Sequence, residues 1–167
     1  MRLFIAIEFN KTIHKALTDI QRIIRFQGVT GRFTRDENLH LTLAFIGDYP
    51  DPDQVLECME SVPFTPFDIS LEGFGHFGDL YWTGIRKSDA LEAYVKRLRH
   101  ALADEGIPFD RKKFSPHITL VRRASFVREP AVVIPPASMT VDHITLFRSD
   151  FANSGMIYTE IGNVSGQ

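Results

Sequence analysis

The sequence of 167 residues predicts an α+β fold of two pseudo-symmetric lobes, each an antiparallel sheet backed by helices, with a cleft between them. Three observations lead to this prediction. Short β-forming segments alternate with amphipathic helical segments, a His-x-Thr-Leu tetrapeptide lies in strand-like context in each half, and both copies follow a long helical segment. We expect residues 1–167 to form a single domain of two intertwined lobes.

The first half begins with a buried strand and a capped helix. Residues 2–9 are rich in β-formers and apolar on both faces, which predicts a central strand. Asn10 is suited to cap a helix over residues 11–27, whose apolar positions repeat at helical spacing until Gly28. The other elements expected in this half are strands at 32–35 and 39–46 and a short helix that starts at Asp51-Pro52 and ends near residue 61.

The second half is predicted to contain more strands and one long helix. We expect strands at 66–75, 79–86, 115–123, 139–148 and 156–163. Gly78-Asp79 predicts a hairpin turn between the first two. Ser88 is suited to cap a helix whose apolar stripe ends at Gly106. The prolines within residues 128–137 indicate an irregular loop before the closing strands.

Composition excludes several classes of protein. Lysine and arginine total 19 against 21 acidic residues, and the net charge of −2 argues against a strongly basic protein that coats a duplex. Contact with nucleic acid should therefore be local, as with a strand end. The single cysteine, Cys58, excludes an internal disulfide and a multi-cysteine zinc site. The N-terminus lacks the features of a signal peptide and no apolar run is long enough to cross a bilayer, so we expect a cytoplasmic protein without membrane association.

The most informative motif is the repeated His-x-Thr-Leu. Three of the six histidines lie in its copies, which begin at His40, His117 and His143. Residues two apart in a strand point to the same face, so each copy places an imidazole beside a hydroxyl. Two such strands facing each other would surround one small anionic group. The alternative for any single copy is the half-exposed polar face of an ordinary strand.

Paired imidazoles and hydroxyls suit the cleavage of a phosphodiester. Histidine titrates near neutral pH, so one ring can accept a proton while another donates one. Threonine hydroxyls can donate hydrogen bonds to the phosphate oxygens. The sequence contains no HExxH motif, no carboxylate at ligand spacing and no nucleophile elbow, which disfavours zinc chemistry and acyl transfer. We therefore expect no metal and no cofactor.

The residues around two of the copies resemble the signatures of a known family. Residues 36–47 and 114–122 are similar to those of the 2H phosphoesterase superfamily, and more narrowly to its RNA 2′,3′-cyclic phosphodiesterase (2′-5′ RNA ligase) branch. Residues 3–7, 80–85 and 146–158 also resemble that branch, so the likeness covers nearly the whole chain.

The resemblance implies an enzyme that hydrolyses a terminal 2′,3′-cyclic phosphate to a 2′-phosphate, together with reversible 2′-5′ ligation. The partner implied is an RNA 3′ end or a nucleotide that carries the cyclic phosphate, and no obligate protein partner is expected. On the family's scheme His40 is the general acid and His117 the general base, while Thr42 and Thr119 hold the phosphate. Arg122 is implied as a substrate contact.

Several alternatives stay open from the residues alone. The two motifs are chemically equivalent, so the sequence does not decide which histidine is the acid. Strict alternation would place Arg123, rather than Arg122, on the face of His117, unless a bulge follows Leu120.

Phe45 and Phe114 are candidates for stacking on a base, with core packing as the alternative. His143 lacks the flanking signature and is expected to be structural. The functions that compete with RNA cyclic phosphodiesterase are a non-catalytic RNA-end binding module and a 2H enzyme acting on another small cyclic phosphate or a 2′-5′ oligonucleotide.

Overall fold

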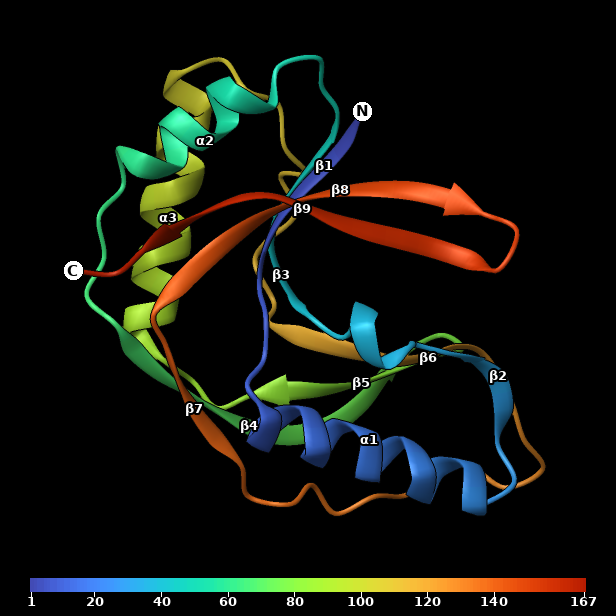
Figure 1. The fold of residues 1–167 in the computed structure, drawn as a ribbon. Helices are drawn as coiled ribbons and strands as arrows, with labels where there is room; N and C mark the ends of the chain where they lie inside the picture. The colour runs from blue at the N-terminus through green and yellow to red at the C-terminus, as the bar shows by residue number, and fades with distance from the viewer.

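The computed structural model describes all 167 residues and contains two antiparallel sheets (Figure 1). The first sheet has the spatial order β3 (Leu41–Asp48), β1 (Arg2–Ile7), β8 (His143–Ala152) and β9 (Gly155–Ser165). The second sheet has the order β2 (Thr30–Phe33), β6 (His117–Ser125), β5 (Leu80–Ile85), β4 (Phe67–Phe77) and β7 (Ser138–Val141). The predicted two-lobed α+β architecture is confirmed.

Neither lobe is a continuous half of the chain. The first sheet takes β1 and β3 from the first half and β8 and β9 from the end of the chain, whereas β2 joins the second sheet. The helices are α1 (Lys11–Phe26), α2 (Pro52–Glu60) and α3 (Asp89–Asp104). As Figure 1 shows, α1 packs on the second sheet and α2 lies beside the first, while α3 packs against α2 and contacts both β3 of the first sheet and β4 of the second. None of these helices has the length and apolar content that a membrane-spanning segment needs.

The three predicted helix caps are present. The side chains of Asn10, Asp51 and Ser88 accept hydrogen bonds from the backbone amides three residues later, at distances of 3.0, 3.2 and 3.1 Å. Each bond satisfies one of the amides that the first turn of a helix leaves unpaired. The caps therefore set where each helix begins.

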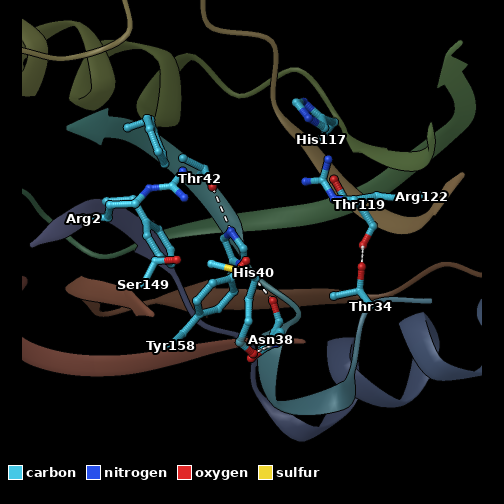
Figure 2. A pocket seen from close by; sticks show the side chains of 13 residues that line it. Arg2, Thr34, Asn38, His40, Thr42, His117, Thr119, Arg122, Ser149 and Tyr158 are labelled. Carbon is cyan, nitrogen blue, oxygen red and sulfur yellow. Dashed lines mark hydrogen bonds between the residues drawn. The ribbon is translucent and has the colours of Figure 1, made fainter. Parts of the chain in front are cut away.

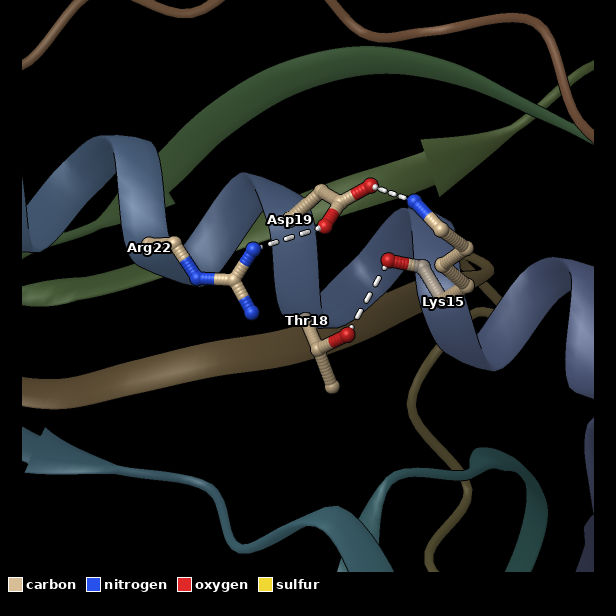
Figure 3. A network of polar contacts seen from close by, with 4 residues as sticks. All are labelled: Lys15, Thr18, Asp19 and Arg22. Atoms are coloured by element: carbon tan, nitrogen blue, oxygen red, sulfur yellow. Dashed lines mark hydrogen bonds and ion pairs between the residues drawn. The ribbon is translucent and has the colours of Figure 1, made fainter.

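Helix α1 shows how the amphipathic pattern is used. Its buried residues are Ile13, Ala16, Leu17, Ile20, Gln21 and Ile24. On the solvent face Lys15 Nζ lies 2.8 Å and Arg22 Nη1 3.2 Å from the carboxylate of Asp19, and the hydroxyl of Thr18 donates to the Lys15 carbonyl (Figure 3). The hydrogen bond from Lys15 lowers the pKa of Asp19 below its ordinary value. Solvent screens these exposed pairs, so the apolar face provides most of the attachment of α1.

Two segments differ from the prediction. The single strand expected at 139–148 is two strands, because the chain leaves the second sheet at Asp142 and enters the first. Apolar residues alternate at 139 and 141 and again at 144 and 146, so the phase of the alternation shifts by one at the break, and the prediction overlooked this shift. A short 3₁₀ helix at Asp36–Asn38 was also not predicted, and β3 begins at Leu41 rather than at residue 39. His40 therefore lies immediately before a strand.

The cores of the two lobes are continuous. One cluster of 34 buried apolar residues includes residues from both sheets and all three α-helices. A separate small cluster of Phe4, Ala6 and Phe147, with Tyr158 packed against it, covers the other face of the first sheet. These aromatic rings form the floor on which the site is built.

Candidate active site

A cavity of about 410 Å³ lies between the two sheets. His40 and Thr42 reach it from the first sheet, and His117, Thr119 and Arg122 reach it from β6 of the second sheet (Figure 2). No carboxylate is among the thirteen residues that line it. The fold thus brings together the residues of two motifs that lie 77 positions apart in the chain.

His40 is held by hydrogen bonds at both ring nitrogens. Its Nδ1 lies 2.6 Å from the carbonyl oxygen of Asn38, and its Nε2 lies 2.9 Å from the hydroxyl of Thr42. A carbonyl only accepts, so Nδ1 carries the proton, and Nε2 of the neutral ring accepts from the threonine. The ring packs against Phe4 and the edge of Tyr158, with centroids 5.0 and 5.2 Å away.

The surroundings of His40 favour its neutral form. Burial lowers the pKa of His40 below its ordinary value, and the positive charges of Arg122 and His117 lower it further, although the bond to the Asn38 carbonyl opposes the shift. The free site therefore contains an unprotonated Nε2 that faces the cavity. An anion between the sheets would favour proton uptake by this ring.

His117 repeats the same anchoring. Its Nδ1 lies 2.7 Å from the carbonyl of Ser115, two residues earlier, just as His40 uses the carbonyl two residues before it. The Nε2 of His117 has no hydrogen-bond partner in the protein. Its ring lies against the edge of Phe77, whose side chain is 50% exposed. The two imidazoles are therefore oriented alike but differ in their access to solvent.

The threonines lie beside their histidines. Thr42 hydrogen-bonds to His40, whereas the hydroxyl of Thr119 faces the cavity and its carbonyl accepts from the hydroxyl of Thr34 at 2.9 Å. Thr34 also lines the cavity and belongs to the segment between β2 and the 3₁₀ helix. The hydroxyl of Thr119 is therefore free to donate to an anion between the sheets, and that of Thr42 becomes free to do so once Nε2 of His40 is protonated and no longer accepts from it.

A bulge determines which arginine faces the cavity. Tyr81 pairs with Val121 and the adjacent Trp82 pairs with Thr119, so Leu120 is an extra residue in β6. Beyond this bulge the alternation is shifted by one, and Arg122 lines the cavity together with Thr119. Arg123 has a positive φ of 53° and an exposed side chain outside the cavity. Of the two alternatives in the sequence, the geometry supports Arg122.

The two aromatic candidates occupy different environments. Phe45 is 36% exposed and lines the cavity, with the guanidinium of Arg2 5.5 Å from its ring centroid. Phe114 does not line the cavity. It packs on the core, with the guanidinium of Arg99 5.6 Å from its ring centroid. The structure therefore does not support the expectation that Phe114 contacts substrate, and core packing explains this residue.

His143 also lies outside the cavity, as expected. Its Nδ1 is 2.7 Å from Asp142 and its Nε2 is 3.6 Å from Glu8. The hydroxyl of Thr145 in the same copy is fully buried and donates to Glu8 at 2.8 Å. The polar side chains of the third copy are thus already paired with carboxylates of the protein.

Sequence reasoning did not identify several cavity residues. Those with polar side chains are Arg2, Thr34, Asn38, Ser149 and Tyr158. Arg2 and Ser149 are on the cavity face only because β8 pairs with β1, a long-range pairing that a single sequence does not display.

The comparisons with known proteins agree on one family. The model of the 2′-5′ RNA ligase superfamily matches residues 12–152. The chain is 30% identical to a protein of Thermotoga maritima named RNA 2′,3′-cyclic phosphodiesterase, with 95% of this chain and 91% of the relative covered. It is 32% identical to the Escherichia coli protein of the same name, with 96% and 93% covered.

A solved structure supports the same grouping. The apo crystal structure of E. coli LigT matches with a TM-score of 0.83 and 29% identity, over 99% of this chain and 98% of that one. The similarity therefore extends over both sheets and the cavity between them.

Proposed function

The chain belongs to the 2′-5′ RNA ligase superfamily, and we propose that it hydrolyses the terminal 2′,3′-cyclic phosphate of RNA to a 2′-phosphate. The observation that carries this proposal is the opposition of two anchored imidazoles, one on each sheet, across a cavity without carboxylates. Such a cavity suits an anionic ester with a proton donor on one side and a proton acceptor on the other.

In the proposed reaction the cyclic phosphate lies between Thr42 and Thr119, whose hydroxyls donate to its non-bridging oxygens. His117 removes a proton from a water molecule, the water oxygen bonds to phosphorus, and the bond from phosphorus to O3′ breaks. His40 then gives its Nε2 proton to O3′. Arg122 offsets the charge that accumulates on the phosphate oxygens in the transition state.

The different surroundings of the histidines support this division of roles. The Nε2 of His117 has no partner in the protein, and the neighbouring Phe77 is half exposed, so water can approach this ring. His40 lies against Phe4 and Tyr158, whose rings shield part of the imidazole from water, as suits a proton donor. The bound phosphate provides the negative charge that raises the pKa of His40 and loads it with a proton.

The proposal includes two further points. The imidazoles supply both proton transfers, so we propose that the reaction needs no metal. With the 5′-hydroxyl of a second RNA end in place of water, the same site would form a 2′-5′ phosphodiester as the bond from phosphorus to O3′ breaks. The reverse of that step would regenerate the cyclic phosphate and the 5′-hydroxyl, with the two histidines exchanging roles by microscopic reversibility. Its proposed partner is an RNA 3′ end or a nucleotide that bears the cyclic phosphate.

The test is incubation with a nucleoside 2′,3′-cyclic phosphate in the presence of EDTA, followed by separation of the 2′- and 3′-phosphate products. We expect the 2′-phosphate. The variants His40→Ala and His117→Ala should each lower kcat by about 10²–10⁴. The two losses should not multiply, so the double variant should be only slightly less active than either single variant. His143→Ala serves as the matched control and should remain active. Absence of turnover would refute the proposal, and formation of the 3′-phosphate would reverse the assignment of the broken bond.

A further inference from the structure

One end of the cavity contains polar groups that the proposed mechanism does not use. Arg2 and Ser149 are partners in the register of β1 and β8, and both line the cavity (Figure 2). Arg2 forms no ion pair with any carboxylate in the protein, and its guanidinium lies over the ring of Phe45. Ser149 is only 7% exposed, yet its hydroxyl has no hydrogen-bond partner in the protein. A hydroxyl that is open to the cavity and has no protein partner, beside an unpaired cation, suits the binding of an anion.

This position lies beyond the catalytic phosphate. Arg2 and Ala6 share one face of β1, and Ala6 pairs with Thr42. Four residues of strand separate the two levels by about 13 Å. The long side chain of Arg2 spans part of that distance, so its guanidinium lies between the level of Thr42 and the level of the Arg2 backbone.

The sign of the charge differs between the two ends of the cavity along the first sheet. At the other end, past His40, a smaller adjoining pocket is lined by Glu8, Asp36 and Glu37. A phosphate backbone would be repelled there and attracted at the end of Arg2. Tyr158 lines both pockets. Burial raises the pKa of Tyr158, and the positive charges of Arg122 and Arg2 oppose this rise, so both arginines act on the same part of the cavity.

We propose that Arg2 and Ser149 form a second anion subsite, which binds the phosphate on the 5′ oxygen of the terminal nucleotide. The enzyme would then favour cyclic phosphate ends that carry a second phosphate over a bare nucleoside 2′,3′-cyclic phosphate. This inference rests on the proposed function. The second phosphate has two sources, an internucleotide phosphodiester or a 5′-terminal phosphate monoester, and the substrates of the test separate them.

The experiment compares kcat/KM for four substrates. They are a nucleoside 2′,3′-cyclic phosphate, the same nucleoside with a 5′-phosphate, a dinucleotide ending in the cyclic phosphate, and that dinucleotide with a neutral methylphosphonate linkage. We expect the charged dinucleotide to exceed the neutral one about tenfold, as for a hydrogen-bonded charge pair. A similar advantage for the 5′-phosphorylated nucleoside would identify the charge itself as the recognised feature, and an advantage limited to the dinucleotide would identify the phosphodiester.

Variants assign the preference to the subsite. Arg2→Ala should reduce the ratio of charged to neutral dinucleotide about tenfold, Arg2→Lys should retain part of it, and Ser149→Ala should reduce it by a smaller factor. Arg128→Ala, which removes an exposed arginine outside the cavity, is the control and should leave the ratio unchanged. Added salt should lower the wild-type ratio, because the interaction is between an exposed charge and an anion.

The outcomes that overturn the inference are specific. A wild-type ratio near one overturns it, and so does an equal loss of activity on all four substrates in Arg2→Ala, which would place Arg2 on the cyclic phosphate itself. Failure of the proposed function is different, because then the wild-type protein would hydrolyse none of the four substrates.

Discussion

Gln21 links the stability of the protein to the orientation of Arg122. Its side chain is 3% exposed, and its Nε2 donates to the carbonyls of Thr34 at 2.8 Å and Leu120 at 3.0 Å. Leu120 is the bulged residue of β6, and its carbonyl also accepts from the amide of Thr34. Gln21→Leu would therefore leave the Thr34 carbonyl without a donor, while Leu120 keeps one.

The expected magnitude follows from that difference. An unsatisfied buried carbonyl costs about 1–3 kcal/mol, and for a chain of this size each kcal/mol lowers Tm by about 2–4 °C. We expect Tm to fall by about 2–12 °C, measured by circular dichroism. Because the bulge directs Arg122 into the cavity, kcat/KM on a cyclic phosphate should also fall when it is measured well below Tm.

A matched substitution on the same helix provides the control. Gln27 forms two hydrogen bonds with Ala131, but in an exposed position at the end of α1 and away from the bulge. Gln27→Leu should lower Tm less and leave kcat/KM unchanged. The reasoning is refuted by a Gln21→Leu variant with the Tm of wild type, or by equal effects of the two substitutions on activity.

Three further predictions follow from other positions. Gly75→Ala would place a Cβ 2.5 Å from the Cζ2 atom of Trp82, so it should destabilise the protein by about 1–3 kcal/mol in denaturant unfolding and lower kcat, since that indole lies 6.4 Å from the ring of His117. Tyr94→Phe removes a buried hydroxyl without a partner and should leave the free energy of unfolding unchanged or raise it by up to about 1 kcal/mol. Since the pKa of His40 is lowered in the folded state, the unfolded chain binds more protons in the window between that pKa and 6.5. Stability should therefore be lost as pH falls below 6.5, and thermal melts of His40→Gln should show a smaller loss over the same window.

Local chemistry predicted much of this molecule from the sequence. The cap residues Asn10 and Ser88 fixed the beginnings of two helices, because a cap needs only its own backbone three residues later. Strand parity likewise predicted that His40 and Thr42 share a face, which their hydrogen bond bears out. The fold class followed from the order of these elements together with the family resemblance.

What the sequence did not predict depends on long-range pairing. The strand expected at 139–148 divides between two sheets, and locally only a one-residue shift in the phase of the alternation marks the break. Ser149 lines the cavity only because β8 pairs with β1. Phe114 lies outside the cavity, where its ring packs against the guanidinium of Arg99. A bulge of one residue decided between Arg122 and Arg123, and bulges have no reliable local signature.

The third His-x-Thr copy shows most directly why local pattern and site differ. Ala6 of β1 pairs with Thr42 on one side and with Thr145 on the other, so both threonines belong to the same sheet. Two copies on one sheet point the same way and cannot enclose a phosphate between them, which makes the copy on β6 indispensable. Burial and charge then decide its partner, because Thr145 is fully buried whereas Thr42 lines the cavity. Thr145 already donates to the carboxylate of Glu8, which would repel a phosphate, whereas no carboxylate lines the cavity beside Thr42. Neutralising this carboxylate by Glu8→Gln would therefore not recruit His143, because Thr145 would remain buried on the same sheet as Thr42.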